Sequence, residues 1–213
     1  MKGVFITLEG IEGSGKTTQV QFLKSRLENL KYRVLATREP GGSRIAEIIR
    51  KILLDDNNRE ISPMTELLLY EAARAQHVDE VIRPALESGA VVISDRFVDS
   101  TTAYQGAGRS IDIETVQVLH RIATRDVWPD MTIVLDVPVK EGLTRIGKCG
   151  KPDRIEQEPE SFHEKVRKSF IELSQKEPNR VKIVDGCKSP PVIAEDIFNL
   201  IKPLLSPANL SGE

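Results

Sequence analysis

The strongest constraint on the fold is the segment at residues 10–17, which reads Gly-Ile-Glu-Gly-Ser-Gly-Lys-Thr. It follows the apolar run at residues 4–8 and precedes a stretch in which Val20, Leu23 and Leu27 recur at helical spacing. A G-x-x-x-x-G-K-T pattern between a strand and a helix forms a loop whose backbone N–H groups surround phosphate groups. The sequence therefore predicts a strand, a phosphate-binding loop and a helix near the start of the chain.

The residue types in this loop suggest separate roles. Glycines permit left-handed backbone conformations and a close approach to phosphate. The lysine would reach the β- and γ-phosphates of a nucleoside triphosphate, and the threonine hydroxyl would bind Mg²⁺. We expect the triphosphate and its metal ion to be held by Gly10, Gly13, Ser14, Gly15, Lys16, Thr17 and Thr18.

Strand-like and helix-like segments alternate along the whole chain, which indicates an α/β fold with a mostly parallel sheet covered on both faces. Strands are expected at residues 3–8, 32–37, 90–94, 131–136 and 181–184. Helices are expected after the phosphate loop and at residues 43–54, 62–82, 112–124, 159–176 and 190–202, with Pro84 bending or restarting the helix before it. This pattern predicts a three-layer α/β/α phosphate-loop NTPase fold in a single domain over residues 1–205, followed by a flexible tail at 206–213.

Composition excludes several classes of protein. The 30 basic and 32 acidic residues give a net charge of −2, which provides no general attraction to nucleic acid or to an anionic membrane. No apolar run approaches the ~18 residues of a membrane span, and no signal-peptide core follows the first residues, so we expect a cytoplasmic protein. Cys149 and Cys187 form no C-x-x-C pair, which argues against a disulfide framework or a zinc site. The histidines also lack ligand spacing and are expected on helix surfaces or half-buried: His77, His120 and His163.

Charged residues follow the predicted strands, at the sheet edge where parallel sheets bind ligands. They are Glu9, Arg38, Asp95 and Asp136.

A guanine-specific GTPase would need an N-K-x-D segment late in the chain, and the sequence has none. A kinase needs cations that hold an acceptor phosphate and screen two approaching anions, which Arg38, Arg74 and Arg96 could supply. The alternative class is a regulatory ATPase that hydrolyses ATP slowly. The dependence of ATP turnover on an added nucleoside monophosphate would distinguish a kinase from such an ATPase.

Five segments together resemble the thymidylate kinases of the bacterial type: residues 10–17, Arg38-Glu39-Pro40-Gly41-Gly42, Ala72-Ala73-Arg74-Ala75-Gln76, Asp95-Arg96-Phe97 and Tyr104-Gln105-Gly106. The likeness continues through Asp153-Arg154-Ile155-Glu156 to the C-terminal helix, so it covers nearly the whole chain. The resemblance implies a homodimeric kinase that uses ATP and Mg²⁺ to convert dTMP into dTDP for dTTP synthesis. A kinase for another nucleoside monophosphate is the nearest alternative.

The resemblance also implies roles in the acceptor site. Arg38 and Arg96 would hold the acceptor phosphate, because the guanidinium fork suits two phosphate oxygens. Asp95 would order the Mg²⁺ shell or hold a neighbouring cation. Tyr70, where the family usually has Phe, would stack on thymine, and Arg74 would donate to a base carbonyl. The other contacts to the base and sugar are expected from Thr101, Gln105, Ser100, Tyr104 near the 2′ position and Glu12 at the 3′-hydroxyl.

The cation that stabilises the transferring phosphoryl group is expected outside the phosphate loop, because Ile11-Glu12-Gly13-Ser14 contains no arginine. The resemblance implies a mobile lid at about residues 145–155, with Arg145, Lys148, Lys151 and Arg154 as candidate cations. Arg154 is the first choice because it keeps the family's Asp-Arg-Ile-Glu context, so the expected catalytic residues are Lys16, Asp95, Arg96 and Arg154. The loop at residues 185–189 resembles the one that borders adenine, with Lys188 as the contact, although a plain strand-to-helix turn would look the same.

Overall fold

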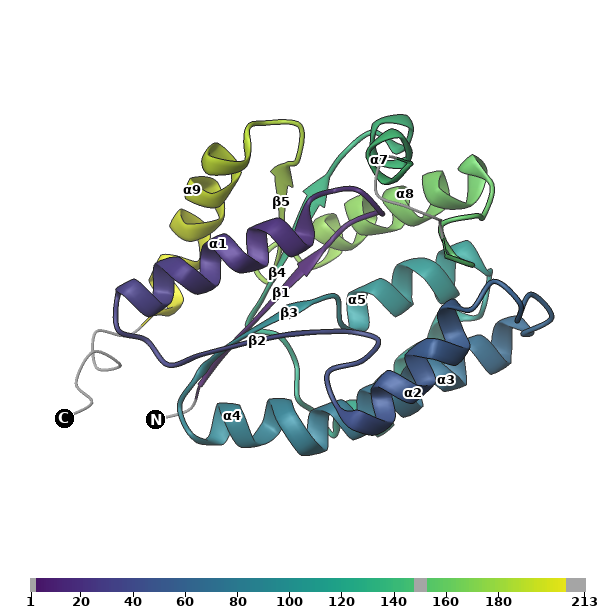
Figure 1. The fold of residues 1–213 in the computed structure, drawn as a ribbon, viewed down its shortest axis with the longest axis horizontal. Helices are drawn as coiled ribbons and strands as arrows, with labels where there is room; N and C mark the ends of the chain where they lie inside the picture. The colour runs from purple at the N-terminus through teal and green to yellow at the C-terminus, as the bar shows by residue number, and fades with distance from the viewer. Residues whose placement is uncertain (1–2, 148–152, 206–213) are drawn as a thin grey trace.

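The computed structural model describes residues 3–147 and 153–205 of the chain. Its centre is a five-stranded sheet formed by β1 (Val4–Glu9), β2 (Val34–Arg38), β3 (Val91–Asp95), β4 (Met131–Asp136) and β5 (Val181–Asp185). The strands lie in the order β2-β3-β1-β4-β5, and every neighbouring pair is parallel (Figure 1). The predicted α/β fold with a five-stranded parallel sheet is confirmed, and each strand begins and ends within two residues of its predicted bounds.

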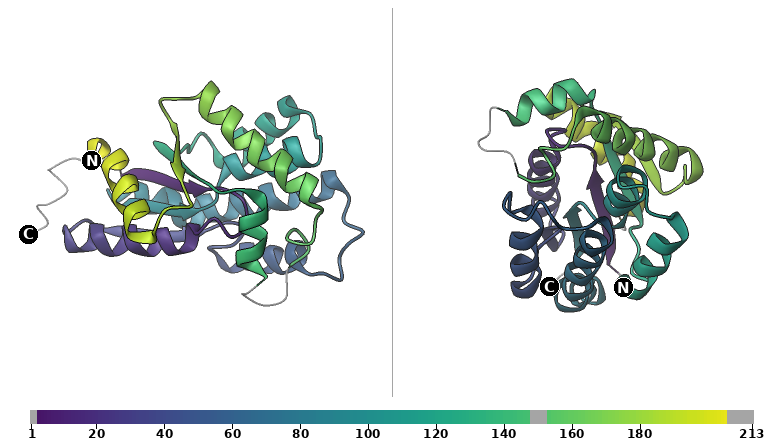
Figure 2. Two further views of the ribbon diagram at one scale, coloured as in Figure 1. Left: turned by 90° about the horizontal axis from the view of Figure 1, so that it is seen from above. Right: turned by 90° about the vertical axis from the view of Figure 1, so that its right-hand side faces the viewer.

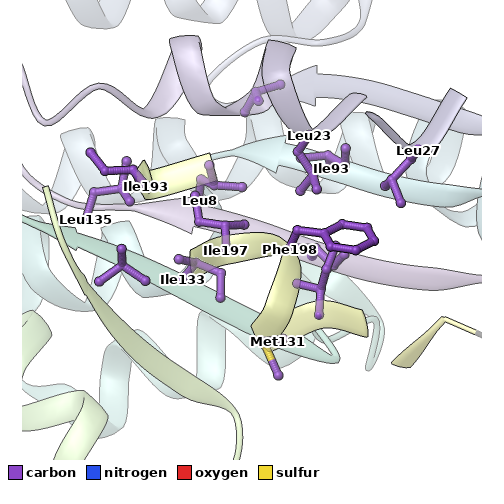
Figure 3. Packing of buried hydrophobic residues seen from close by; sticks show 14 of the residues in the cluster. Leu8, Leu23, Leu27, Ile93, Met131, Ile133, Leu135, Ile193, Ile197 and Phe198 are labelled. Atoms are coloured by element: carbon purple, nitrogen blue, oxygen red, sulfur yellow. The ribbon is translucent and has the colours of Figure 1, made fainter. Parts of the chain in front are cut away.

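One face of the sheet packs against α1 (Lys16–Asn29) and α9 (Pro190–Ile201). Alternate side chains of a strand point to opposite faces, and on this face β1 contributes Ile6 and Leu8. They form one buried cluster with Leu23 of α1 and Ile197 and Phe198 of α9 (Figure 3). The helix that begins in the phosphate loop is therefore fixed directly against the sheet.

The opposite face of the sheet carries two further buried clusters. Phe5 of β1 packs with side chains of the π-helical turn η1 (Val78–Ile82), of α4 (Arg83–Glu87) and of α5 (Val98–Thr101). Val134 of β4 packs with η2 (Thr102–Gly108) and α8 (Glu160–Lys176). Helices thus lie on both sides of the sheet, which confirms the three-layer α/β/α arrangement (Figure 2).

Three more helices complete the layer that contains η1 and α5. They are α2 (Arg44–Leu54), α3 (Pro63–His77) and α6 (Ile113–Thr124), and α3 lies between the other two. The hydroxyl of Ser62 accepts a hydrogen bond from the N–H of Thr65, which caps α3 as its Ser-Pro start predicts. The predicted helix at 62–82 is α-helical only to His77 and continues through η1, and Pro84 lies in the first turn of α4.

Some elements were not predicted, and some predictions fall outside the described residues. The sequence analysis gave no helix for α7 (Val139–Ile146), nor for α5 and η2. These elements are too short for a strong apolar period. The predicted tail and the middle of the predicted lid, with Lys148, Cys149 and Lys151, lie outside the described ranges. Cys187 is an exposed free thiol. In residues 3–147 and 153–205, no helix has the length and apolar character needed to cross a membrane.

Candidate active site

The phosphate-binding loop joins the end of β1 to the start of α1 and has left-handed backbone at its glycines. Gly13 has φ 69° and Gly15, which precedes the first turn of α1, has φ 93°. A Cβ atom at Gly13 would lie 2.2 Å from the carbonyl oxygen of Gly142 in α7, so only glycine fits there. The loop therefore brings the positive N-terminus of α1 to the edge of the sheet, where it can bind phosphate.

The side chain of Lys16 folds back over this loop. Its Nζ atom donates to the carbonyl oxygens of Gly10 and Ile11, at 3.1 and 2.7 Å, and to the Ser14 hydroxyl at 3.2 Å. Burial and the positive charge of Arg96 lower the pKa of Lys16 to about 8, although nearby carboxylates oppose this change. The direct partners of the ammonium group are neutral oxygens, so a bound phosphate would add an anion in direct contact with it.

Thr17 and Asp95 meet at the mouth of the loop. The Thr17 hydroxyl donates a 2.7 Å hydrogen bond to Oδ2 of Asp95 at the end of β3. In the described part of the chain, no group of three His, Cys, Asp or Glu side chains could hold a metal ion by itself. Mg²⁺ in kinases is usually bound by one or two protein oxygens together with phosphate oxygens and water. A hydroxyl and a carboxylate beside a phosphate loop fit this mode of binding.

The loop opens into a cleft of about 270 Å³ that most of the predicted site residues share. This volume is close to the lower end of small-molecule sites, ~300 to 1,000 Å³, so the cleft suits a nucleotide-sized ligand. The predicted residues that line it are Glu12, Gly13, Lys16, Thr17, Arg38, Tyr70, Arg74, Asp95, Arg96, Ser100, Thr101, Tyr104 and Gln105. Gly10, Ser14 and Gly15 belong to the adjoining loop, and Thr18 is exposed in the first turn of α1.

Arg96 lies at the centre of one polar cluster in the cleft. Its Nη2 atom donates to Oε1 of Glu12 at 2.9 Å, and its guanidinium group lies 4.9 Å from the centroid of the Tyr104 ring. The Tyr104 hydroxyl donates to the same Glu12 oxygen at 2.5 Å. Burial alone would raise the pKa of Glu12, but Arg96, His163, Lys16 and Tyr104 outweigh it and hold the pKa at about 2. Glu12 therefore stays ionised at neutral pH.

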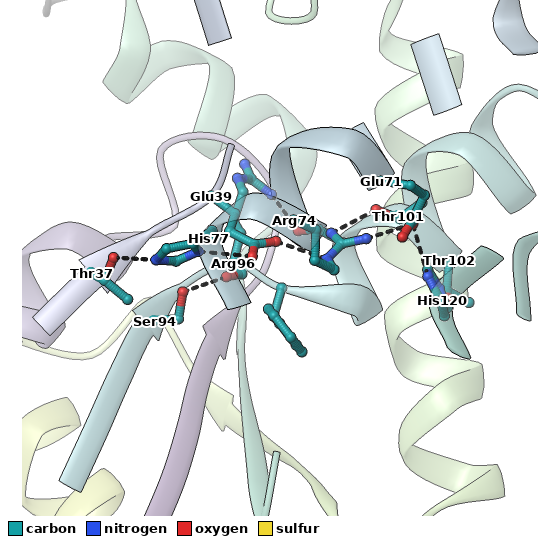
Figure 4. A network of polar contacts seen from close by, with 12 residues as sticks. Thr37, Glu39, Glu71, Arg74, His77, Ser94, Arg96, Thr101, Thr102 and His120 are labelled. Carbon is teal, nitrogen blue, oxygen red and sulfur yellow. Dashed lines mark hydrogen bonds and ion pairs between the residues drawn. The ribbon is translucent and has the colours of Figure 1, made fainter. Parts of the chain in front are cut away.

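Arg74 lies at the centre of a second cluster and is only 2% exposed. It donates through Nε to Glu39 at 2.8 Å, through Nη1 to Glu71 at 2.5 Å and through Nη2 to the Thr101 hydroxyl at 2.9 Å (Figure 4). These contacts use three of the five N–H donors that a guanidinium group carries. Arg74 can therefore be held by protein groups and still donate to a ligand in the cleft.

The prediction that the three histidines lie on helix surfaces or half-buried is wrong. All three are at most 1% exposed. Each Nδ1 atom lies against a buried carboxylate of the site: His77 against Glu39 at 3.0 Å, His120 against Glu71 at 2.9 Å and His163 against Glu12 at 3.2 Å. The helices that carry them turn them inward because these carboxylates provide polar partners in the interior. The histidines therefore support the clusters around Arg74 and Arg96.

The residues predicted to contact the base and sugar come from three neighbouring elements. Tyr70 is half-buried on α3, one turn before Arg74. Ser100 of α5 accepts from Nη1 of Arg96 at 3.0 Å. Gln105 of η2 is 1% exposed and donates to Oε1 of Glu66 at 2.8 Å. The structure thus brings the ring of Tyr70 into the same cleft as a hydroxyl and an amide that lie at least 30 positions later in the sequence.

Arg38 and a neighbour that the sequence analysis missed lie at the outer edge of the cleft. The Arg38 side chain is 54% exposed and donates to both carboxylate oxygens of Glu47, at 2.9 and 3.0 Å. Arg50 also lines the cleft and donates to the carbonyl oxygen of Pro40 at 2.8 Å. Glu47 and Arg50 are three residues apart on α2, and this spacing could have indicated that Arg50 faces the same side as the partner of Arg38.

Arg154 does not line the cleft. It is 7% exposed, and its guanidinium group donates to the carbonyl oxygen of Leu53 at 2.9 Å and pairs with Glu66 at 2.7 Å. Its Nη2 atom is buried and has no hydrogen-bond partner. The structure therefore places Arg154 in a buried ion pair beside the site, and its catalytic role stays a prediction.

The other end of the predicted lid reaches the phosphate loop. Nη1 of Arg145 in α7 donates to the carbonyl oxygen of Gly13 at 3.2 Å and to that of Gly186 at 3.3 Å. Arg145 therefore bridges the phosphate loop and the loop after β5. Lys188 of that second loop pairs with Asp196 of α9 at 2.8 Å and does not line the cleft.

Comparison with known proteins gives one consistent result. A family model described as thymidylate kinase matches residues 8–197. A protein named thymidylate kinase from Pelobacter propionicus is 52% identical over 201 residues, which cover 92% of this chain and 92% of that protein. One of the same name from Thermoanaerobacter sp. is 47% identical over 205 residues, covering 96% of this chain and 100% of that protein. The crystal structure of thymidylate kinase from Ehrlichia chaffeensis superposes with a TM-score of 0.78 at 32% identity, covering 95% of this chain and 99% of that one.

Proposed function

The chain belongs to the thymidylate kinase family, and we propose that it transfers the γ-phosphoryl group of ATP to dTMP in the presence of Mg²⁺. One observation carries the proposal. The phosphate-binding loop and three arginines, Arg38, Arg74 and Arg96, open into the same cleft. The loop suits the phosphates of a donor nucleotide, and the arginines suit an acceptor that is itself a phosphate.

The acceptor phosphate would lie between the phosphate loop and Arg96. Arg96 keeps its guanidinium group in place through the carbonyl oxygen of Gly10 at 3.1 Å and through Glu12. Arg38, which is exposed and held by Glu47, would approach the same phosphate from the opposite edge. Two cations on one acceptor phosphate lower the repulsion between it and the triphosphate, which is the main electrostatic barrier to transfer.

The chemistry requires no protein nucleophile, because an oxygen of the acceptor phosphate attacks the γ-phosphorus directly. The protein contributes position and charge, with Lys16 at the donor phosphates and Arg96 at the acceptor. Mg²⁺, held through Thr17 and Asp95, would neutralise developing negative charge on the phosphate oxygens. Expulsion of water from the closed cleft would strengthen each of these interactions.

The choice of base and sugar would depend on the two polar clusters. Arg74 has N–H donors beyond its three protein contacts and would donate to a carbonyl group of thymine, while the ring of Tyr70 would stack on the base. Glu12 would accept from the 3′-hydroxyl group. Tyr104, which is 5% exposed and held by Glu12, would occupy the space of a 2′-hydroxyl group and so favour a deoxyribose.

The test is a coupled assay of ADP release with ATP and Mg²⁺, run with dTMP, dUMP, dCMP, dGMP and UMP in turn. We expect turnover to depend on an added monophosphate and to be fastest with dTMP. Lys16→Ala should abolish transfer without unfolding the protein, because the side chain hydrogen-bonds to three residues of its own loop. Hydrolysis of ATP without any monophosphate would favour a regulatory ATPase, and a preference for another monophosphate would contradict the substrate.

We also propose that the enzyme is a cytoplasmic homodimer that pairs through α2, α3 and α6. These helices lie side by side and expose apolar side chains that a partner could cover: Ile48, Ile52, Met64, Leu68, Val118 and Ile122. Exposed apolar side chains gathered on neighbouring helices are typical of interaction sites. Light scattering after gel filtration should give a dimer for the wild type and a monomer for Ile122→Glu. Phe22→Glu, at an exposed position of α1 on the other side of the sheet, should leave the dimer intact.

A further inference from the structure

Glu9 is a completely buried carboxyl group that the proposed reaction does not use. It ends β1, directly before the phosphate loop, and is 0% exposed. Burial, and after it the negative charge of Asp99, raise the pKa of Glu9 to about 8, although Arg96 favours the ionised form. Burial of a carboxyl group is unfavourable, so its contacts should indicate why this position has one.

Both oxygens of Glu9 contact residues of the segment that carries Arg96. Oε1 accepts a 2.7 Å hydrogen bond from the backbone N–H of Phe97, the next residue after Arg96. Oε2 accepts a 2.5 Å hydrogen bond from the hydroxyl of Ser100. The same hydroxyl accepts from Nη1 of Arg96 at 3.0 Å. Glu9 therefore holds the backbone beside Arg96 with one oxygen and the partner of its guanidinium group with the other.

The backbone of Arg96 needs such support. Its φ angle of 73° lies in the left-handed region that residues with side chains rarely adopt. Its N–H donates to the carbonyl oxygen of Leu8 at 3.0 Å, and its carbonyl oxygen accepts from the Ser94 hydroxyl at 2.7 Å (Figure 4). Without Glu9, the N–H of Phe97 would be buried with no acceptor. The backbone on the C-terminal side of Arg96 would then lose a hydrogen bond that holds it in place.

We propose that Glu9 is a positioning residue that fixes Arg96 relative to the phosphate loop. The inference rests on the proposed function, in which Arg96 holds the acceptor phosphate. Because Glu9 is joined directly to Gly10, a shift of the loop and a shift of Arg96 are coupled through one side chain. The distance between the donor and acceptor phosphates is thereby set by a residue that touches neither of them.

The test compares three substitutions at this position, with affinities for dTMP and ATP measured separately by calorimetry. Glu9→Ala removes both acceptors, and Glu9→Asp is one methylene too short to hold Phe97 and Ser100 together. We expect both variants to bind dTMP at least tenfold more weakly and to bind ATP within threefold of the wild type. Glu9→Gln keeps the length and an oxygen for the Phe97 N–H, so it should stay within threefold for both ligands.

Thr7→Val is the matched control, because Thr7 lies on the same strand, is also 0% exposed and forms a 2.9 Å hydrogen bond with Thr132 of β4. It should leave both affinities unchanged. If Glu9→Ala does not fold, the inference is tested by comparing the dTMP and ATP affinities of Glu9→Asp with those of Glu9→Gln. Equal losses for dTMP and ATP, or an unaffected Glu9→Asp variant, would overturn the inference alone. A wild-type protein that does not bind dTMP would overturn the proposed function and this inference with it.

Discussion

The hydroxyl of Thr17 lies 2.7 Å from Oδ2 of Asp95, although the two residues are 78 positions apart in the sequence. The sheet brings them together, because β1 and β3 are parallel neighbours with Leu8 in register with Asp95. The phosphate loop that follows β1 therefore starts beside the carboxylate that ends β3. Two oxygen donors in this position suit Mg²⁺ at the edge of a bound triphosphate.

Asp95→Asn tests this pair. The amide oxygen can still accept from Thr17, but the negative charge is lost, so we expect kcat to fall at least roughly tenfold and the Mg²⁺ requirement to rise. The measurement is the coupled assay titrated with MgCl₂ at saturating ATP and dTMP. Thr17→Ser, which keeps the hydroxyl, should remain close to the wild type. An unchanged Mg²⁺ dependence of Asp95→Asn would remove Asp95 from the metal site.

A second prediction concerns the contact between Arg74 and the base. Arg74→Ala would leave Glu39 and Glu71 buried without their cation, and loss of one member of a buried ion pair typically costs ~3 to 5 kcal/mol of stability. Arg74→Lys is the milder change, because it keeps the charge and removes the guanidinium fork. We expect the lysine variant to bind dTMP more weakly by roughly 1 to 3 kcal/mol and to bind ATP unchanged.

Calorimetry with each nucleotide checks this prediction. Arg83→Lys provides the control, since Arg83 is an arginine at the start of α4 that does not line the cleft. It should leave both affinities as they are. If Arg74→Lys weakened the binding of ATP and dTMP equally, Arg74 would have a structural role and no direct contact with the base.

The parts of the site that could be predicted depend on local patterns or on the topology of a parallel sheet. The phosphate loop is a contiguous motif, and the strand ends follow from short apolar runs, so Lys16, Thr17 and Asp95 could be placed together before any coordinates. The partners of buried side chains could not be predicted in this way. Glu39 meets Arg74 across 35 positions, and this contact depends on how β2 and α3 pack.

Burial of the histidines was missed for the same physical reason. His77 lies on a helix with apolar and polar residues on several sides, so its spacing does not show which side faces the core. Its carboxylate partner, Glu39, can be identified only when the turn after β2 is placed next to α3. The contact of Arg154 could not be predicted either, because its partner Glu66 lies in a distant helix. Sequence patterns give the positions of elements, whereas ion pairs in the interior depend on tertiary packing.

The structure leads to a third prediction about the lid cations. Arg145 donates to the carbonyl oxygen of Gly13 in the phosphate loop, whereas Arg154 is buried against Glu66. We therefore expect Arg145→Ala to lower kcat roughly tenfold or more with little loss of stability. Arg154→Ala should mainly lower the free energy of unfolding, by roughly 1 to 3 kcal/mol, because Glu66 keeps its contact with Arg109.

Single-turnover kinetics and urea unfolding of the two variants distinguish these effects. Arg145→Lys should recover part of the rate, since it keeps a charge at the same position. A stable Arg154→Ala enzyme with a strongly reduced kcat would instead mean that Arg154 leaves Glu66 and reaches the phosphates during the reaction. In that case the original expectation for Arg154 would hold and Arg145 would be a structural residue.

The last prediction concerns stability and pH at Glu9, whose carboxyl group is faced by the charges of Asp99 and Arg96. Its pKa is raised from 4.5 to about 8 in the folded protein, so between these two values the folded state binds more protons than the unfolded state. Stability contributed by the protonated group is then fully present below pH 4.5 and is lost as the pH rises through 8. Glutamine cannot titrate, so Glu9→Gln should gain stability relative to the wild type, on the order of 1 to 3 kcal/mol, between pH 5 and pH 9.

Urea unfolding of both proteins across this range measures the difference, and Glu114→Gln, at an exposed position of α6, should follow the wild type. Parallel curves for the wild type and Glu9→Gln would mean that Glu9 is already ionised at neutral pH, stabilised by Arg96 more strongly than burial opposes it.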